Sequence, residues 1–119
     1  MADLESSEVG MKFSQGKPRW SLLPPDEIEE VVKVLTEGAK KYKDNNWQKV
    51  DPKEYLDALG RHINAYRKGE KYDVGVDCNG KAGDGYHHLA HAICNCLFIM
   101  WNDNQLNKVD SIDEEQLWK

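Results

Sequence analysis

Apolar residues recur at helical spacing in three stretches of the chain, whereas the alternation typical of strands is nearly absent. The first stretch begins at residues 24–27, where two prolines precede two acids, and stops near residues 44–46. Gly38 lies inside it and costs about 1 kcal/mol relative to Ala, which suggests that packing or a ligand needs the space. The predicted apolar face of this helix is Ile28, Val31, Val32, Leu35, Ala39 and Tyr42.

Two more helices follow. The second begins at Asp51 and Pro52, a favourable N-cap followed by a favourable first residue, and ends at Gly69. The third runs from about residue 87 to 102 and is the most apolar, so we expect it to be central. A short helix is expected at 113–118. The predicted apolar faces are Leu56, Leu59, Ile63 and Tyr66 on the second helix, and Leu89, Ile93, Cys96, Leu97 and Met100 on the third.

These elements predict an all-α fold in one domain spanning residues 1–119. Residues 1–11 are expected to be flexible, 12–102 to form an N-terminal arm and a helical core, and 103–119 to be a polar tail. Three helices in a chain of this size bury their apolar faces poorly alone. We therefore predict a small helical bundle completed by oligomerisation, as a dimer or a tetramer.

Composition narrows the possible functions. A formal net charge of −5 argues against general nucleic-acid binding. No apolar run approaches the roughly 20 residues that span a bilayer, and the N-terminal residues lack the features of a signal peptide, so we expect a cytoplasmic protein without membrane contact. Cys78, Cys94 and Cys96 lack the spacing of a zinc site, and we predict that they are reduced core residues.

Two segments combine basic and aromatic residues, namely KFSQGKPRW at 12–20 and KKYKDNNW at 40–47. Gly16 and Pro18 exclude a regular helix from the first, which we expect to be a loop or an extended arm. Cations and flat rings of this kind suit a nucleotide, by pairing with phosphates and stacking on a base. A solvated tail and a helix end anchored by Trp47 are the structural alternatives.

Polar side chains interrupt the third helix at regular spacing. His88, His91 and Asn95 are three and four residues apart and therefore share one face. Such groups on a buried helix are costly unless something satisfies them, which indicates a metal or phosphate site. A hydrogen-bonded core network and an interhelical contact are the other interpretations.

The glycine-rich stretch between the second and third helices carries four carboxylates. Glu70 and Asp73 are close enough in sequence to reach one point, and Asp77 and Asp84 add further oxygen ligands. Oxygen ligands of this kind suit Mg²⁺ or Mn²⁺. The stretch is not an EF-hand, and a solvated charged loop is the alternative.

The order of four motifs resembles one family: KF…GKPRWSLLPP, EGAKKY…NW, RH…A…GE..D and HLAHA..N, over residues 12–101. It is similar to the phage-encoded dATP/dGTP diphosphohydrolases, which are related to the all-α pyrophosphohydrolases of MazG and HisE type. The resemblance implies an oligomeric, Mg²⁺- or Mn²⁺-dependent enzyme of the host cytoplasm. It would cleave purine deoxynucleoside triphosphates, dGTP or dATP, between the α and β phosphates.

The resemblance, together with the residue patterns, assigns candidate roles. Candidate catalytic residues are Glu70, Asp73 and His62; candidate metal ligands are Glu70, Asp73, Asp84, His88 and His91. Candidate substrate-binding residues are Lys17, Arg19, Trp20, Lys41, Tyr42, Asn46, Trp47, Arg61 and Asn95.

Two features depart from the expected pattern. Lys33 stands where the third Glu of a MazG-type EExxE motif would be, and the stretch from Asp73 to His88 is longer than the family pattern. Asp77 or Asp84 would then have to supply the acidic ligand expected just before the HLAHA motif. Without that ligand, the alternative function is a non-catalytic phage protein that sequesters a nucleotide or a nucleotide-derived signal. A purely structural helical oligomer is a third interpretation.

Overall fold

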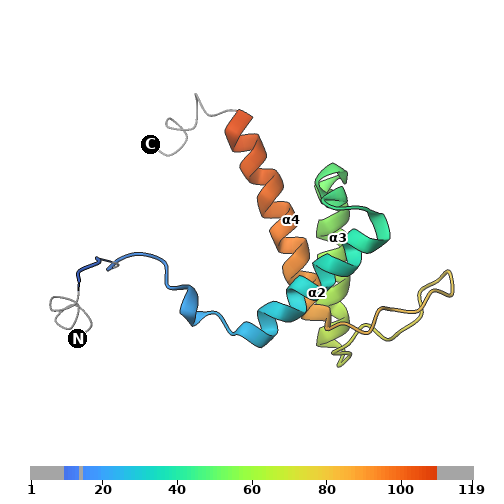
Figure 1. Ribbon diagram of the computed structural model, residues 1–119. Coiled ribbons are helices and arrows are strands. Elements are labelled where there is room, and N and C mark those ends of the chain that lie inside the picture. The colour runs from blue at the N-terminus through green and yellow to red at the C-terminus, as the bar shows by residue number, and fades with distance from the viewer. Residues whose placement is uncertain (1–9, 14, 110–119) are drawn as a thin grey trace.

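The computed structural model describes residues 10–13 and 15–109, and within these residues the fold is all-α, as predicted (Figure 1). The elements are η1 (Trp20–Leu22), α2 (Pro25–Tyr42), η2 (Asn46–Lys49), α3 (Pro52–Arg67) and α4 (His88–Val109). Extended pairing in the described part of the chain is limited to two isolated antiparallel bridges, Tyr72 with His87 and Val76 with Ala82. The helix expected at 113–118 lies outside the described residues.

The helix boundaries follow local signals. Asp51 caps α3 by accepting a hydrogen bond of 3.0 Å from the backbone N–H of Lys53. Gly69, with φ 102°, ends the same helix by donating to the carbonyl of Tyr66. The third helix was predicted to end near residue 102, but α4 continues to Val109. No Gly or Pro occurs between residues 103 and 109 to stop it.

The central position expected for the third helix is confirmed, because α4 packs against both α2 and α3 (Figure 1). The core consists of Val31 of α2 with Ala90 and Cys94 of α4. Cys94 is 2% exposed, and its thiol donates to the carbonyl of Val31 over 3.6 Å. Small residues on α4 allow this close approach of the two helices.

The side of α4 that faces the other helices differs from the prediction. Ile93 and Leu97, expected in the core, are each 44% exposed, and Met100 is 59% exposed. Instead, α4 turns its small and polar side chains inward, so that His88 and Asn95 are buried. Ile93 and Met100 of this bulky stripe therefore lie on the outer face of the single chain.

The prediction of three core cysteines was also wrong for two of them. Cys78 is exposed because it lies in the glycine-rich stretch, and Cys96 is exposed because it shares the outward stripe of α4. Gly38 was expected to leave space for packing or for a ligand, but a Cβ there would meet nothing within 4 Å. Packing within the chain therefore does not explain this glycine.

Residues 70–87 form a hairpin-like excursion that leaves the ends of α3 and α4 and returns (Figure 1). Asp77 shapes its far end by accepting hydrogen bonds of 2.8 Å and 2.9 Å from the backbone N–H groups of Asn79 and Lys81. Nearer the helices, the backbone N–H of Asp73 donates to the carbonyl of Tyr86 over 2.8 Å. The two arms of the hairpin are therefore paired near its base.

No helix in the described part of the chain combines the length and the apolar character needed to cross a bilayer.

Candidate functional site

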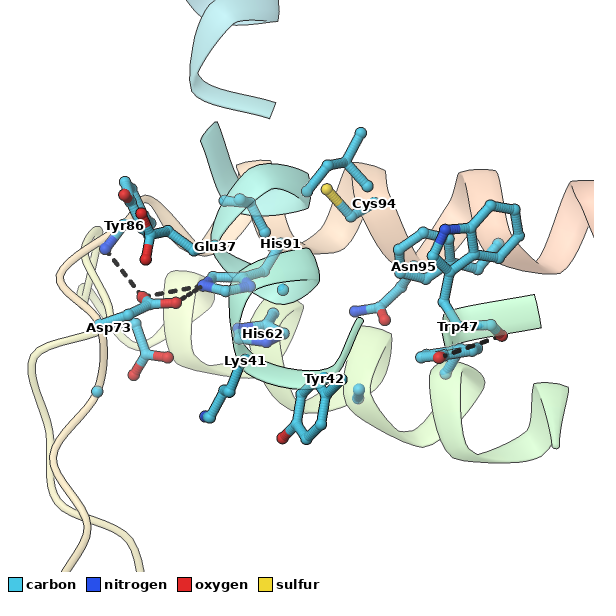
Figure 2. Close-up of a pocket in the computed structure, with 18 of the residues that line it drawn as sticks. Glu37, Lys41, Tyr42, Trp47, His62, Asp73, Tyr86, His91, Cys94 and Asn95 are labelled. Atoms are coloured by element: carbon cyan, nitrogen blue, oxygen red, sulfur yellow. Dashed lines mark hydrogen bonds and ion pairs between the residues drawn. The ribbon is translucent and has the colours of Figure 1, made fainter. Parts of the chain in front are cut away.

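A pocket of about 1740 Å³ opens between α2, α3, α4 and the base of the hairpin (Figure 2). Its volume exceeds that of a typical small-molecule site, roughly 300–1000 Å³, so the pocket is open rather than closed around one ligand. One end carries imidazoles and carboxylates, and the other carries aromatic rings. The candidate metal ligands and catalytic residues that line it are His62, Glu70, Asp73, Asp84, His88 and His91.

Asp73 is the residue shared by two potential metal-binding groups. The first consists of His62, Asp73 and His88, and the second of Asp73, Asp84 and His91. In each group one ligand atom per residue lies within 4.8 Å of the others. The structure thus brings five of the six predicted metal-binding or catalytic residues into two adjoining donor sets.

The backbone around Asp73 is tightly packed. Its carbonyl accepts a hydrogen bond of 2.8 Å from the backbone N–H of Gly85. A Cβ at Gly83 would overlap both the backbone and the carboxylate of Asp73. Gly83, which the sequence analysis missed, is therefore required for the position of the shared carboxylate.

Glu70 was predicted as a metal ligand beside Asp73, but its carboxylate faces His88 and belongs to neither donor group. The buried imidazole of His88 lies with Nε2 3.1 Å from Oε1 of Glu70 and with Nδ1 2.8 Å from Nδ1 of His62. When Nε2–H donates to Glu70, Nδ1 is left as the lone-pair nitrogen. The hydrogen bond from His88 holds the pKa of Glu70 below its usual value.

His62 of α3 is neutral at pH 7. Burial, with smaller contributions from His91 and His88, lowers its pKa to about 4. Its ring stacks on that of His91, with centroids 4.5 Å apart and an interplanar angle of 3°. When its Nδ1–H donates to His88, its other nitrogen has a free lone pair, which suits a metal ligand or a proton acceptor.

Asp84 is one of the two residues that could supply the acidic ligand expected just before the HLAHA motif. Its Oδ2 lies 2.8 Å from Nε2 of His91, and its Oδ1 accepts from the backbone N–H of Tyr86 at 3.0 Å. Burial opposes ionisation of Asp84, but these hydrogen bonds outweigh it and lower its pKa. Asp77 lines the pocket too, yet its carboxylate is engaged by backbone amides of the hairpin.

Cations line the side of the pocket between α2 and the hairpin. Lys41 has its ammonium 5.5 Å from the centre of the Tyr42 ring. Lys81 of the hairpin lines the same wall, and the closeness of Lys41 lowers the pKa of Lys81. Lys81 was not predicted, because only the fold of the hairpin brings it to Lys41.

The aromatic end is anchored by Trp47, which stacks on Phe98 with ring centroids 4.6 Å apart and meets the edge of Trp101 at 5.0 Å. This packing agrees with the structural alternative, an anchor at a helix end, although Trp47 also lines the pocket. The predicted substrate-binding residues that line the pocket are Lys41, Tyr42, Asn46, Trp47, Arg61 and Asn95.

The three predicted binding residues of the N-terminal arm do not reach this pocket. Lys17, Arg19 and Trp20 are absent from its lining, and Trp20 is 79% exposed. Figure 1 shows the arm running away from the three helices of its own chain. Gly16, with φ 81°, and Pro18 prevent the arm from continuing as a helix, as expected.

Comparison with known proteins decides the family. The family model described as dATP/dGTP diphosphohydrolase, N-terminal, matches residues 7–112. The chain belongs to this family. The dATP/dGTP diphosphohydrolase match therefore covers the arm, the hairpin and all three α-helices, and it confirms the resemblance noted in the sequence.

A curated relative from Salmonella phage PMBT28, named dATP/dGTP diphosphohydrolase, is 39% identical over 93 residues. The similarity covers 78% of this chain but only 29% of the relative, so the chain spans less than a third of that protein's length. No solved structure matches the chain.

Proposed function

We propose that this chain is the catalytic module of a metal-dependent diphosphohydrolase for purine deoxynucleoside triphosphates. The products would be a deoxynucleoside monophosphate and pyrophosphate. The observation that carries the proposal is the pair of donor groups joined by Asp73, set in an open pocket with cations along one wall. Family membership supports the reaction class, since the phage relative bears the name of this activity.

The donor atoms fit a divalent cation. Asp73 and Asp84 offer carboxylate oxygens, and His62 and His91 offer imidazole nitrogens; His88 would offer its Nδ1 once a bound ion replaced the hydrogen bond from His62. A mixed nitrogen and oxygen set suits Mn²⁺ better than Mg²⁺, which prefers oxygen ligands. When bound, such an ion would neutralise phosphate charge and lower the pKa of a coordinated water.

The surrounding side chains would hold the substrate. Lys41, Lys81 and Arg61 line the pocket and would pair with the phosphates. A phosphate placed against Lys41 and Lys81 would also offset the repulsion between their two positive charges. His62, neutral and carrying a lone pair, would accept a proton from the attacking water if it is not used as a ligand.

A sequestering protein remains the second candidate function. It was motivated by the possible loss of the acidic ligand before the HLAHA motif, and the position of Asp84 beside Asp73 and His91 supports the presence of such a ligand. The geometry therefore favours turnover over sequestration.

We also propose that a second copy of the chain completes the fold. The outward stripe of α4, with Ile93 and Met100, and the exposed Leu56 of α3 offer apolar surface that two copies would bury. The arm, which does not reach its own pocket, would then be available to the pocket of the other copy. Light scattering should give a dimer or tetramer, and Met100→Glu should shift it towards the monomer; a wild-type monomer at high concentration would rule the assembly out.

The enzymatic proposal is tested by incubating the protein with each dNTP and NTP in Mn²⁺ or Mg²⁺ and separating the products by chromatography. We expect monophosphate and pyrophosphate from dGTP and dATP, with faster turnover in Mn²⁺. Recovery of intact nucleotide bound to the protein would support sequestration instead. Neither turnover nor binding would leave only a structural role.

A further inference from the structure

Asn95 is a buried polar residue for which the fold supplies no partner in the described part of the chain. It is 6% exposed, and none of the hydrogen bonds formed among the described residues involves its side chain. Every fully enclosed side-chain nitrogen or oxygen among these residues has a hydrogen bond. The amide atoms of Asn95 have none, so they are not fully enclosed and remain accessible from the pocket. Figure 2 shows the carboxamide projecting from α4 into the pocket. Water in the open pocket can solvate the amide in the free protein, so its donor and acceptor remain available to a ligand.

The position of Asn95 relates it to the rest of the pocket. It follows His91 by four residues on α4, a rise of about 6 Å, and precedes Phe98 by three. The pocket-facing row of α4 therefore passes from imidazoles to a carboxamide and then to an aromatic ring. A nucleotide with its phosphates at the imidazole end would place its base beside Asn95.

We propose that the carboxamide of Asn95 reads the six-membered-ring edge of the purine and accepts both adenine and guanine. This inference rests on the nucleotide-binding part of the proposed function. Adenine presents a donor, its 6-amino group, beside the acceptor N1, whereas guanine presents the acceptor O6 beside the donor N1–H. A carboxamide has one acceptor and one donor side by side, so it can pair with either edge through two hydrogen bonds.

The switch between bases requires the amide to turn half a revolution about its Cβ–Cγ bond. A protein hydrogen bond to the amide would fix one orientation and select one base. Because no described residue bonds to Asn95, both orientations remain available. Pyrimidines also carry an adjacent donor and acceptor, so this pairing does not by itself reject them. The aromatic walls formed by Trp47 and Phe98 would have to discriminate against these smaller bases.

Binding can be measured without hydrolysis, using α,β-methylene analogues of dATP, dGTP and purine deoxyriboside triphosphate, whose C6 carries only hydrogen. Calorimetry in Mn²⁺ on the wild type should show the analogue without a 6-substituent binding roughly 5- to 150-fold more weakly than the other two. Asn95→Leu should weaken the dATP and dGTP analogues by a similar or larger factor and the third analogue less, because unsubstituted purine offers Asn95 only its N1 acceptor. Asn104→Leu is the control, because Asn104 is exposed on the same helix outside the pocket.

Asn95→Asp gives an independent test that does not depend on an apolar substitution folding well. A carboxylate only accepts hydrogen bonds, and guanine offers two adjacent donors, N1–H and its 2-amino group, where adenine offers one. The affinity ratio of the dGTP to the dATP analogue should rise at least about fivefold. An unchanged ratio, or an Asn95→Leu protein that binds all three analogues like wild type, would overturn the proposal. Asn95-dependent binding without any turnover of dATP or dGTP would instead support base reading and contradict only the catalytic half of the proposed function.

Discussion

Oε1 of Glu70 and Nε2 of His88 lie 3.1 Å apart, which links the start of the hairpin to the first turn of α4. This contact fixes the orientation of the buried imidazole and leaves its Nδ1 directed at His62. Under the proposed function Glu70 would therefore position His88 as a ligand, in the manner of carboxylates behind metal-bound histidines.

Glu70→Ala should lower Mn²⁺ affinity by about 10- to 100-fold, because His88 loses the acceptor that sets its tautomer. Glu70→Gln retains an acceptor oxygen and should lose less. Isothermal titration with Mn²⁺ measures both, and Glu29→Gln, on the exposed side of α2, is the control. Equal and complete loss in Glu70→Ala and Glu70→Gln would indicate that the Glu70 carboxylate is itself a ligand.

Gly83→Ala should reduce dNTP turnover more than tenfold, because the new methyl group overlaps the backbone and carboxylate of Asp73. The same crowding should lower the free energy of unfolding by roughly 1 to 3 kcal/mol, measured by urea titration. Gly60→Ala is the matched control, since a Cβ at this helical glycine meets nothing within 4 Å. That control should raise stability by up to about 1 kcal/mol and retain activity. Normal turnover by Gly83→Ala would show that the position of Asp73 is not critical.

The metal-free protein should lose stability as the pH falls from about 6.5 to about 4. Over this range an unfolded chain protonates His62, whose folded-state pKa is about 4, so protons favour the unfolded state. In EDTA, the difference in unfolding free energy between wild type and His62→Asn should therefore change with pH between 6.5 and 5, above the main titration of the carboxylates. A constant difference would contradict the lowered pKa.

The three thiols should react at different rates. Cys94 is buried, and burial raises its pKa to about 11, so it should resist iodoacetamide at pH 8 while Cys78 is labelled. Cys96 is exposed in the single chain but lies on the stripe that a second copy would cover, so its labelling should slow as protein concentration rises. Mass spectrometry of peptides locates the labels, with urea-unfolded protein as the control. Labelling of native Cys94 as fast as Cys78 would contradict the described core.

Much of the fold was predictable because local signals coincide with periodicity. Asp51 and Pro52 mark the start of α3, and Gly69 marks its end, where the structure has them. The orientation of α4 was not predictable, because its helix has two competing faces. Periodicity identifies the bulky stripe of Ile93 and Met100, but it cannot indicate whether that stripe packs within the chain or against another chain.

The site was predictable where it follows helix geometry. The shared face of His88, His91 and Asn95 is a consequence of spacing alone, and all three residues line the pocket. The roles of Lys81 and Gly83 depend on how the hairpin folds back, which no periodic pattern encodes. The basic residues of the arm are the reverse case. Composition predicted that they bind the substrate, but the arm does not approach the pocket of its own chain.

The most direct test of the account compares Asp73→Asn with Asp57→Asn, an exposed carboxylate of α3 outside the pocket. Release of dGMP and pyrophosphate from dGTP is measured in Mn²⁺, and binding of the α,β-methylene dGTP analogue is measured alongside it. The account predicts at least a hundredfold loss of turnover in Asp73→Asn, with a folded protein that still binds the analogue, and wild-type turnover in Asp57→Asn. Undiminished release of pyrophosphate by Asp73→Asn would contradict it.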